Sequence, residues 1–270
     1  MISNVLSGDA KEALLPSSGE LKEVFDKKYG GQDKIGWGPT RRQKWGYYLP
    51  ADVYEGCVVK QVFDGCSWID IGGGRSLFPD NPGLARLLVS RCSRVVAVDP
   101  SENVKENDFT HSRFQCCLEE YRPDACFDLA TLRMVVEHVE KPPEFIDALW
   151  RVLRPGGRVV VFTVNKTSPI TLVSRTLPFA LHYPIKRFLW GGDEEDTFPV
   201  RYRMNTKHIL GELFRRQGFS ELAFAYLDDL STFNQFRCLG RLELFVWRLC
   251  QEAGLKYPEN CLLGVYEKPT

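Results

Sequence analysis

The sequence predicts a single α/β domain built on a doubly wound, largely parallel sheet. Segments rich in apolar and β-branched residues alternate with amphipathic segments over most of the chain, as expected where strands alternate with helices. The strand-like segment 158–163 contains the uninterrupted apolar run Val159 to Phe162. Runs of this kind are typical of parallel strands that are covered on both faces.

The expected elements follow one another with short connections. Apolar runs predict strands at 67–71, 94–99, 114–118, 127–132, 158–163, 221–227 and 261–266. Helical periodicity predicts helices at 21–29, 51–63, 82–90, 141–154, 206–217 and 233–253. In the helix at 206–217, Thr206 is the expected N-cap and Gly218 ends the helix. In the helix at 233–253 we expect the following residues to face inward: Phe236, Leu239, Leu242, Phe245, Val246 and Leu249.

Composition excludes several classes of protein. The 270 residues carry 35 basic and 35 acidic side chains, so no long-range field favours nucleic acid or anionic membrane. The nine cysteines include no C-x-x-C pair, which favours buried thiols in a reducing compartment. We find no secretory h-region and no run of about 18 apolar residues. The expected location is the cytoplasm.

Two segments interrupt the alternation of strands and helices. Residues 35–55 place several aromatic side chains among basic residues and turn formers, and they predict either a cover over a pocket or a loop packed on the core. Residues 169–190 are strongly apolar but contain Arg175, Lys186 and Arg187. We interpret that segment as an inserted helical lid, with a membrane-surface helix as the alternative.

A glycine turn marks the expected ligand site. The strand 67–71 contains Asp70 and runs directly into Gly72, Gly73 and Gly74. Without Cβ atoms, the backbone can turn sharply there and approach a ligand closely. The second strand ends in Asp99, 25 residues after Gly74. This spacing suits a strand–helix–strand unit whose carboxylate receives a ribose hydroxyl.

Three nucleotide-binding patterns compete for this turn. No string matches the P-loop pattern G-x-x-x-x-G-K-[ST]. The dinucleotide pattern G-x-G-x-x-G is met by Gly72 and Gly74, but Leu77 stands at its third position. An NAD(P)-dependent oxidoreductase therefore remains an alternative, and the third option is a pocket for S-adenosylmethionine.

Four blocks in the right order support the third option. They are Asp70-Ile-Gly-Gly-Gly74, Val95-Val-Ala-Val-Asp99, Phe127-Asp-Leu-Ala with Glu137-His138-Val139, and Leu153-Arg-Pro-Gly-Gly157 before the fifth strand. In these blocks the chain resembles class I S-adenosylmethionine-dependent methyltransferases, and in particular the group that includes ubiquinone and menaquinone biosynthesis methyltransferases. The resemblance covers residues 60–165 well. Ser76 departs from it, since the family often has a third glycine there.

The resemblance implies a seven-stranded Rossmann-like sheet with the cofactor at its carboxyl edge. We expect an N-terminal cover segment (1–60), a cofactor-binding core (61–167), an inserted lid (168–204) and the C-terminal half of the sheet domain (205–270). The implied cofactor-binding residues are Asp70, Gly72, Gly73, Gly74, Asp99, Pro100, Leu118, Glu119 and Arg133. Asp70 would reach the methionine end of the cofactor through water or only cap the turn. Arg133 would meet a carboxylate or form a surface ion pair.

The expected reaction is methyl transfer to a small hydrophobic or aromatic acceptor, at oxygen. His138 and His182 are the candidate general bases, since histidine titrates near neutrality; structural roles compete for both. Candidate substrate-contacting residues are Trp37, Tyr48, Tyr183 and Trp190. The alternatives are a C- or N-methyltransferase and a non-catalytic module that binds S-adenosylmethionine.

Few other partners are expected. Four histidines without recurring ligand spacing give no metal site. The neutral net charge argues against nucleic acid, although Arg41, Arg42 and Lys44 keep RNA as a minor alternative. Peripheral membrane contact would run through the lid.

Overall fold

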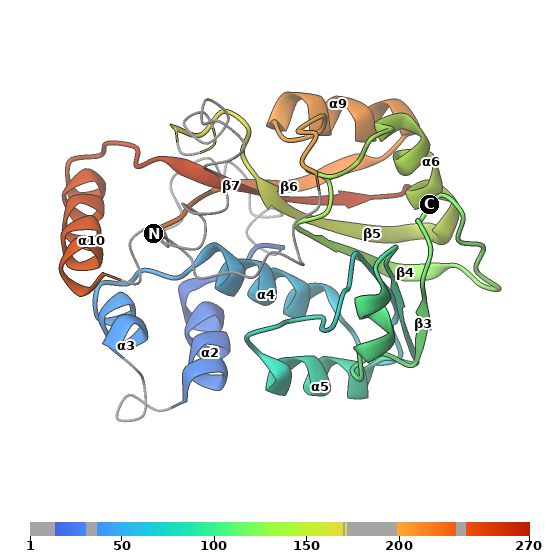
Figure 1. The fold of residues 1–270 in the computed structure, drawn as a ribbon, viewed down its shortest axis with the longest axis horizontal. Coiled ribbons are helices and arrows are strands. Elements are labelled where there is room, and N and C mark those ends of the chain that lie inside the picture. The colour runs from blue at the N-terminus through green and yellow to red at the C-terminus, as the bar shows by residue number, and fades with distance from the viewer. Residues whose placement is uncertain (1–13, 31–36, 170, 172–198, 231–235) are drawn as a thin grey trace.

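The fold is an α/β sandwich with one central sheet (Figure 1). The computed structural model describes residues 14–30, 37–169, 171, 199–230 and 236–270, without the side chains of residues 37 and 237. Seven strands form one sheet in the order β3-β2-β1-β4-β5-β7-β6. The predicted seven-stranded, doubly wound sheet is therefore confirmed.

The first five strands of the sheet are parallel. They are β1 (Ser67–Ile71), β2 (Arg94–Val98), β3 (Ser112–Phe114), β4 (Phe127–Arg133) and β5 (Leu153–Val164). The strand β7 (Glu259–Glu267) pairs antiparallel with both β5 and β6 (Ser220–Asp228). Because β5 and β6 are both antiparallel to β7, they run in the same direction. The carboxyl ends of β1, β2, β4, β5 and β6 thus share one edge of the sheet.

Helices cover both faces of the sheet, as its apolar strands require. On one face lie α4 (Pro50–Gln61) and α5 (Pro82–Arg91), and on the other lie α6 (Pro142–Val152) and α9 (Lys207–Gln217) (Figure 1). A short 3₁₀ helix, η2 (Glu102–Glu106), follows β2. The strand residues Trp68, Ile69, Val160 and Val161 are fully buried between these layers.

Local signals in the sequence explain where the helices begin and end. The Thr206 side chain accepts the backbone N–H of Ile209 at the start of α9, and Gly218 ends that helix with a φ of 103°, as predicted. Asn81 caps α5 by accepting the N–H of Leu84, and Pro82 follows in the first turn. Each cap satisfies a backbone donor that has no partner within the helix.

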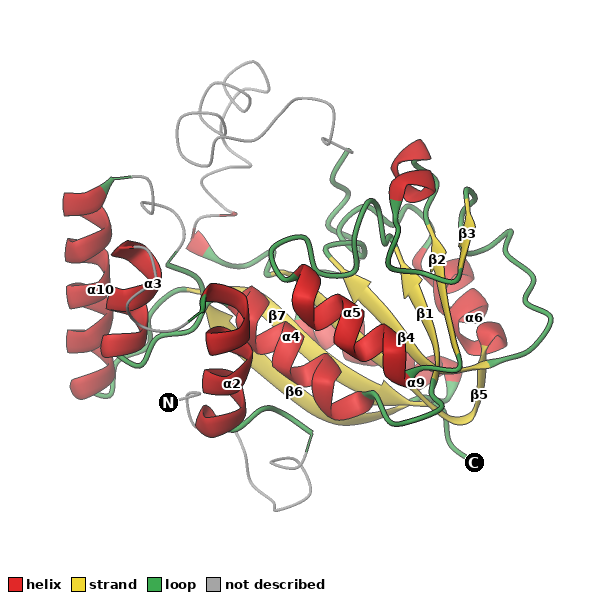
Figure 2. Cartoon of the chain, turned by 90° about the horizontal axis from the view of Figure 1, so that it is seen from below, coloured by secondary structure: helices red, strands yellow, loops and turns green. Residues whose placement is uncertain are grey.

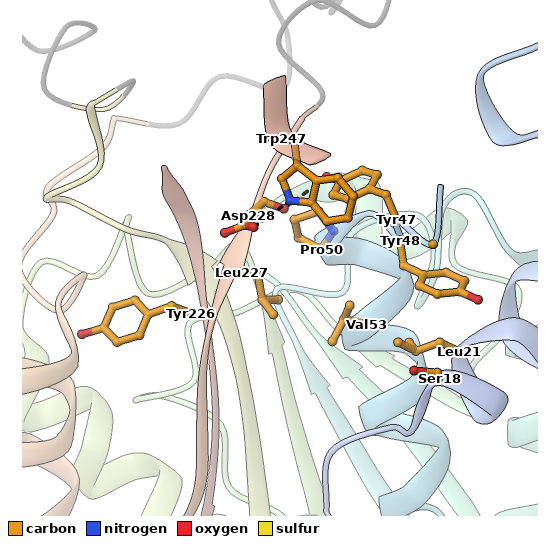
Figure 3. Close-up of a pocket in the computed structure, with 11 residues that line it drawn as sticks. Ser18, Leu21, Tyr47, Tyr48, Pro50, Val53, Tyr226, Leu227, Asp228 and Trp247 are labelled. Atoms are coloured by element: carbon orange, nitrogen blue, oxygen red, sulfur yellow. Dashed lines mark hydrogen bonds between the residues drawn. The ribbon is translucent and has the colours of Figure 1, made fainter. Parts of the chain in front are cut away.

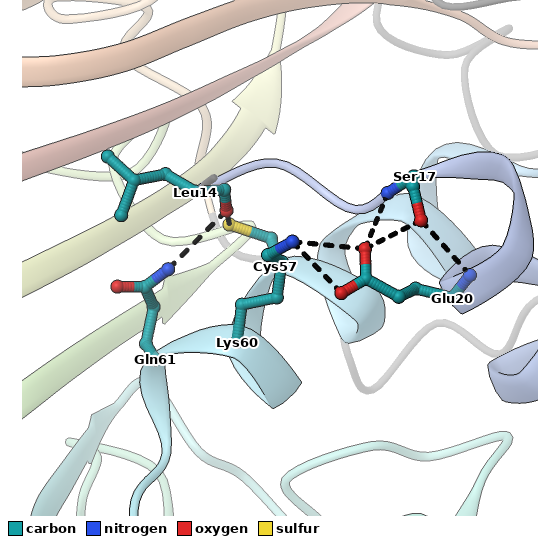
Figure 4. A network of polar contacts seen from close by, with 6 residues as sticks. All are labelled: Leu14, Ser17, Glu20, Cys57, Lys60 and Gln61. Atoms are coloured by element: carbon teal, nitrogen blue, oxygen red, sulfur yellow. Dashed lines mark hydrogen bonds and ion pairs between the residues drawn. The ribbon is translucent and has the colours of Figure 1, made fainter. Parts of the chain in front are cut away.

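The N-terminal part of the chain is tied to α4 by polar contacts. In α2 (Ser18–Tyr29), Glu20 forms a capping box with Ser17 and also accepts two hydrogen bonds from Lys60, at 2.9 and 3.0 Å (Figure 4). A second, buried contact joins Lys28 to Asp52 at 3.0 Å and to Glu55 at 2.8 Å. Burial of this charged cluster requires that its members stay paired, so α2 and α4 are held in one arrangement.

One helix pair projects from the end of the sheet where β6 lies. The helix α3 (Trp37–Lys44) and the helix α10 (Arg237–Glu252) lie side by side there (Figures 1 and 2). Leu244 and Trp247 of α10 are buried, and Tyr47 packs edge-on against Trp247 with ring centroids 5.2 Å apart. No helix in the part of the chain that the structure describes has the length and apolar character needed to cross a membrane.

Three expectations are wrong in detail. The third strand ends at Phe114 rather than at Leu118, and residues 37–44 form a helix where we expected no regular element. The orientation predicted for α10 is also wrong, because five of the residues assigned to its inner side are 42–57% exposed: Leu239, Leu242, Phe245, Val246 and Leu249. The apolar face that the periodicity detects is the exposed one, and the helix packs on the domain through Leu244 and Trp247 instead.

The prediction of buried thiols holds for only part of the nine cysteines. All nine are free, but Cys57, Cys66 and Cys261 alone are buried, whereas Cys117, Cys126 and Cys238 are exposed.

Candidate cofactor site at the carboxyl edge of the sheet

The glycine turn follows β1 at the carboxyl edge. Gly72 adopts a φ of 69° and donates its N–H to the carbonyl oxygen of Val98 at 2.8 Å, so the turn is fixed to the end of β2. A Cβ atom on Gly72 would lie 2.3 Å from Cγ2 of Val135. The absence of a side chain at Gly72 therefore serves the packing of two loops, those after β1 and β4.

Gly74 has a different role from Gly72. Its φ is 42°, and a Cβ atom there would meet nothing within 4 Å, so this part of the backbone faces open space. The Gly74 N–H donates to Oδ2 of Asp99 at 3.0 Å, and the Ser101 N–H donates to Oδ1 of the same carboxylate at 2.7 Å. Asp99 thus connects the loops after β1 and β2, beside a stretch of accessible backbone.

Both carboxylate oxygens of Asp99 keep acceptor capacity after these two bonds. A carboxylate offers about four lone-pair sites, and only two are used by Gly74 and Ser101. Asp99 is 7% exposed, and Pro100 beside it is exposed. This arrangement suits a ligand whose hydroxyl groups donate hydrogen bonds to Asp99 and whose remaining part extends along the backbone at Gly74.

Asp70 lies beneath this turn rather than at its surface. Its Oδ1 accepts a hydrogen bond from the Thr131 hydroxyl at 2.6 Å, and Thr131 in turn accepts from Nε1 of Trp68 at 2.7 Å. A Cβ atom on Gly73 would come within 2.6 Å of Asp70 Oδ2. Burial raises the pKa of Asp70 to about 7, although the bond from Thr131 and the charge of Arg133 lower it.

Arg133 at the end of β4 acts electrostatically on two buried carboxyl groups. Its positive charge lowers the pKa values of both Asp70 and Glu137, and burial raises both by more. Oε2 of Glu137 accepts from the Thr163 hydroxyl at 2.8 Å, and Nδ2 of Asn205 donates to that hydroxyl at 2.7 Å. Oδ1 of Asn205 is buried without a hydrogen-bond partner. Glu137, Thr163 and Asn205 therefore form a hydrogen-bonded polar cluster at the carboxyl ends of β4 and β5.

Two non-glycine residues close to Glu137 in the chain or in space adopt left-handed backbone. Met134 has a φ of 55°, and Tyr202, whose N–H donates to the carbonyl oxygen of Glu137 at 3.1 Å, has a φ of 51°. Left-handed backbone at a non-glycine residue costs about 1–3 kcal/mol and is concentrated at functional sites. Met134 precedes Glu137 and Tyr202 precedes Asn205, so two of the segments that contribute to the polar cluster contain strained backbone.

His138 lies in the turn that follows β4. Its Nδ1 lies 3.1 Å from the carbonyl oxygen of Pro199. Because a carbonyl can only accept, Nδ1 carries the proton in this contact, and the neutral ring then has its unprotonated nitrogen at Nε2. The ring is half-buried. This geometry is compatible with a base, and the role itself stays a prediction.

The residues predicted to contact the adenine follow β3. Leu118 is 3% exposed within the core, whereas Cys117 beside it is exposed. The carbonyl oxygen of Glu119 accepts hydrogen bonds from Arg122 at 2.6 Å and from Arg151 at 3.2 Å. The expected contacts of Leu118 and Glu119 with a bound base stay predictions.

Tyr48 lines a hollow at the far end of the same edge (Figure 3). The hollow measures about 80 Å³, less than the roughly 300 Å³ of a small ligand pocket, so it is too small to enclose a ligand by itself. Close to it, the Tyr47 hydroxyl donates to the carbonyl oxygen of Asp228 at 3.1 Å and accepts from the Leu230 N–H at 2.9 Å. The carboxylate of Asp228 accepts from Trp247 Nε1 at 2.9 Å.

The other predicted substrate residues cannot be placed. Trp37 begins α3, but its side chain lies outside the described structure. His182, Tyr183 and Trp190, together with most of the expected lid, lie outside the described residues as well. After that segment the chain contacts the turn that follows β4, since the Arg201 N–H donates to the carbonyl oxygen of Glu137 at 2.7 Å.

The fold and the site together define a class of protein: an α/β domain that binds a nucleoside-type cofactor at the carboxyl edge of its sheet. The comparisons with known proteins narrow this class. The sequence model described as "Methyltransferase domain" matches residues 39–223, well over half of the chain. The chain belongs to this family, which confirms the predicted class I S-adenosylmethionine-dependent methyltransferase.

One relative and two solved structures illustrate the similarity. The ubiquinone biosynthesis O-methyltransferase of Caulobacter sp. (strain K31) is 35% identical over 115 residues, which are 39% of this chain and 43% of that protein. The YcgJ protein from Bacillus subtilis has a TM-score of 0.51 at 15% identity, over 80% of this chain and 98% of that chain. The [4+2]-cyclase SpnF has a TM-score of 0.50 at 16% identity, over 99% of this chain and 100% of that chain.

The extent of these similarities limits what each one shows. The chain spans less than half the length of the curated relatives that it matches. The two structures share the fold, and one of them is a cyclase, so the fold alone does not define a reaction. The family assignment decides between the cofactor alternatives, in favour of S-adenosylmethionine over NAD(P).

The residues at the edge fit this cofactor. The open space at Gly74 leaves room along the backbone, and Asp99 offers acceptors for ribose hydroxyls. When bound, S-adenosylmethionine supplies a methyl group already activated on a sulfonium. The protein must then align the acceptor and exclude water, which can account for about 7–11 kcal/mol of the barrier.

Proposed function

We propose that this protein transfers a methyl group from S-adenosylmethionine to an oxygen atom of a small, apolar or aromatic acceptor. The proposal rests mainly on one observation: Gly74, Asp99 and Arg133 lie at the carboxyl edge of the sheet in a chain that belongs to the methyltransferase-domain family. The choice of oxygen is supported by relatives described as ubiquinone biosynthesis O-methyltransferases.

The shape of the site supports an apolar acceptor. The hollow beside Tyr48 is bordered by Leu21, Val53, Leu227 and Trp247, and it lies at the same sheet edge as the glycine turn. We propose that Tyr48 and Val53 form one wall of the acceptor site. The predicted contacts of Trp37, Tyr183 and Trp190 would complete that site.

His138 is the proposed general base. A phenol or alcohol acceptor must lose a proton, and a positioned base contributes about 10²–10⁴-fold to such a step. The Pro199 carbonyl holds Nδ1–H, so the proton would be taken by Nε2. The nearby Glu137 carboxyl, whose pKa is raised by burial, would be the positioning partner of that turn.

The test is an assay with methyl-labelled S-adenosylmethionine and a panel of phenols, catechols, alcohols, amines and carbon nucleophiles. We expect label in an aryl or alkyl ether. For the acceptor found, His138→Ala should lower kcat about 10²-fold or more, whereas His208→Ala, on an exposed residue of α9, should change it less than twofold. Label on nitrogen or carbon, or binding of the cofactor without product from any acceptor, would contradict the proposal.

A further inference from the structure

The outer side of α10 is apolar and exposed, although its inner side is already packed. Leu244 and Trp247 face the sheet domain and are 6% and 5% exposed. On the other side, residues at positions i, i+3, i+7 and i+10 form one stripe along the helix. With Phe245 this stripe, which we call the α10 stripe, consists of Leu239, Leu242, Phe245, Val246 and Leu249, each 42–57% exposed.

The size of the α10 stripe separates it from ordinary surface residues. Five large apolar side chains, each about half exposed, leave on the order of 400 Å² of apolar area on one helix face, and the largest apolar patch of a monomer, which has about this size, is often functional. Elsewhere in the described chain, the other large exposed apolar residues do not gather on one helix; for example, Phe63 follows α4 and Leu87 lies on α5. Single exposed residues of this kind need no explanation.

Basic side chains accompany the stripe. Arg241 and Arg248 are exposed on one flank of α10, and the acidic residues of the helix are Glu243, which is buried, and Glu252, which pairs with Arg248 at 2.7 Å. The adjacent helix α3 contains Arg41, Arg42 and Lys44 and no acidic residue. Arg42 is buried, so the basic character of this end of an otherwise neutral chain comes from Arg41, Lys44 and Arg241.

A basic hollow lies where α3 meets the stripe. Thr40, Arg41, Lys44 and Trp45 line a hollow of about 260 Å³. The Trp45 ring packs edge-on against Phe245, with ring centroids 6.4 Å apart. An apolar stripe, a tryptophan at its border and cationic side chains beside it are therefore contiguous on one surface.

We propose that α10 and α3 form a docking surface for an anionic phospholipid membrane. The α10 stripe would enter the boundary between headgroups and acyl chains, as in helices that lie in the interface plane. Arg241, Arg248 and Lys44 extend charged groups on long apolar stems that can reach headgroup phosphates, and each such residue near an anionic surface adds to the attraction. The proposal is independent of methyl transfer and places the membrane contact on α10 instead of on the lid.

A second copy of the chain fits this surface less well. Two copies joined through α10 would bring their arginine flanks together, and like charges across an interface are unfavourable.

The test is co-sedimentation of the full chain with vesicles of phosphatidylcholine containing about 30% phosphatidylglycerol, compared with vesicles of phosphatidylcholine alone. We expect the wild type to bind the anionic vesicles and to bind the neutral ones at least tenfold less. Leu242→Gln/Leu249→Gln should weaken binding at least tenfold. Its matched control is Phe63→Gln/Leu87→Gln, which alters residues of 47% and 43% exposure away from α10 and should change binding less than twofold.

A second pair of variants tests the charge. Arg241→Glu/Arg248→Glu should also weaken binding at least tenfold and remove its dependence on salt. Arg215→Glu/Arg216→Glu on α9 makes the same change of charge, and Arg216, like Arg248, pairs with a glutamate at i±4; this control should bind as the wild type does.

Three results would overturn the proposal. The first is equal binding of the wild type and the stripe variant, or no binding of the wild type to anionic vesicles. The second is a dimer in sedimentation velocity that Leu242→Gln/Leu249→Gln dissociates, which would assign the stripe to a second copy. The third is a large fall in melting temperature of this variant without a change in vesicle binding, which would mean that the chain itself covers the stripe.

Discussion

The two ends of the carboxyl edge are built in different ways. At the end formed by β1 and β2, short loops supply backbone N–H groups and a carboxylate, and Asp99 joins Gly74 to Ser101 within 28 residues of sequence. At the end formed by β6, the contact between Tyr47 and Asp228 connects residues 181 positions apart. The first end is determined by residues that are close in sequence, whereas the second forms only when distant parts of the chain come together.

This difference explains which parts of the molecule the sequence could predict. The glycine turn and Asp99 follow from contiguous motifs, because the chemistry of a nucleoside-type ligand requires small residues and a carboxylate at fixed spacing. The cluster of Glu137, Thr163 and Asn205 could not be found, since nothing in the sequence indicates that Asn205 returns across the intervening segment to Thr163.

Two errors have physical causes of the same kind. The end of β3 was misplaced because Ser112, Arg113 and Phe114 are all exposed on an edge strand, where burial imposes no pattern. The orientation of α10 was misjudged because helical periodicity detects an apolar face and does not say what covers it. The packed side is defined by Leu244 and Trp247 instead.

The largest expected effect concerns the two conformationally special glycines. Gly72→Ala places a methyl group against Val135 at positive φ, and we expect it to lower the free energy of unfolding by about 3 kcal/mol or more. Gly74→Ala, where the same methyl meets open space, should cost only about 1–2 kcal/mol yet weaken S-adenosylhomocysteine binding more strongly. Urea denaturation and calorimetry measure the two quantities.

A second substitution sharpens this contrast. In a Val135→Ala background the clash at Gly72 is removed, so the cost of Gly72→Ala should fall to the positive-φ cost alone, which a double-mutant cycle would show. Additive effects of the two substitutions would contradict the loop packing described above.

A smaller effect concerns pH. Burial raises the pKa of Asp70 to about 7, above the value of about 3.9 in an unfolded chain. The folded state therefore binds more protons between these values, and Asp70 reduces stability increasingly as the pH rises from about 4 to about 7. Asp70→Asn should gain stability relative to the wild type over this interval and show a constant difference above it.

Urea denaturation at half-unit steps between pH 4.5 and 8.5 would measure this difference. For one titrating group the difference can change by at most about 1.4 kcal/mol per pH unit. Asp80→Asn, at an exposed position, is the control for removal of a carboxyl group. A difference between Asp70→Asn and the wild type that stays constant over this range would mean that Asp70 does not titrate in it.

The most direct test of the account is the affinity of the wild type and of Asp99→Ala for S-adenosylhomocysteine, measured by calorimetry with NAD as the competing ligand. We predict that the wild type binds S-adenosylhomocysteine and not NAD, and that Asp99→Ala weakens binding by about 1.5–3 kcal/mol, the loss of a charged hydrogen bond. Asn107→Ala, which removes a 3.2 Å bond to the Gly73 carbonyl of the same loop but keeps the carboxylate, should lose less. Unchanged affinity in Asp99→Ala, or binding of NAD alone, would contradict the assignment of this edge to the methyl donor.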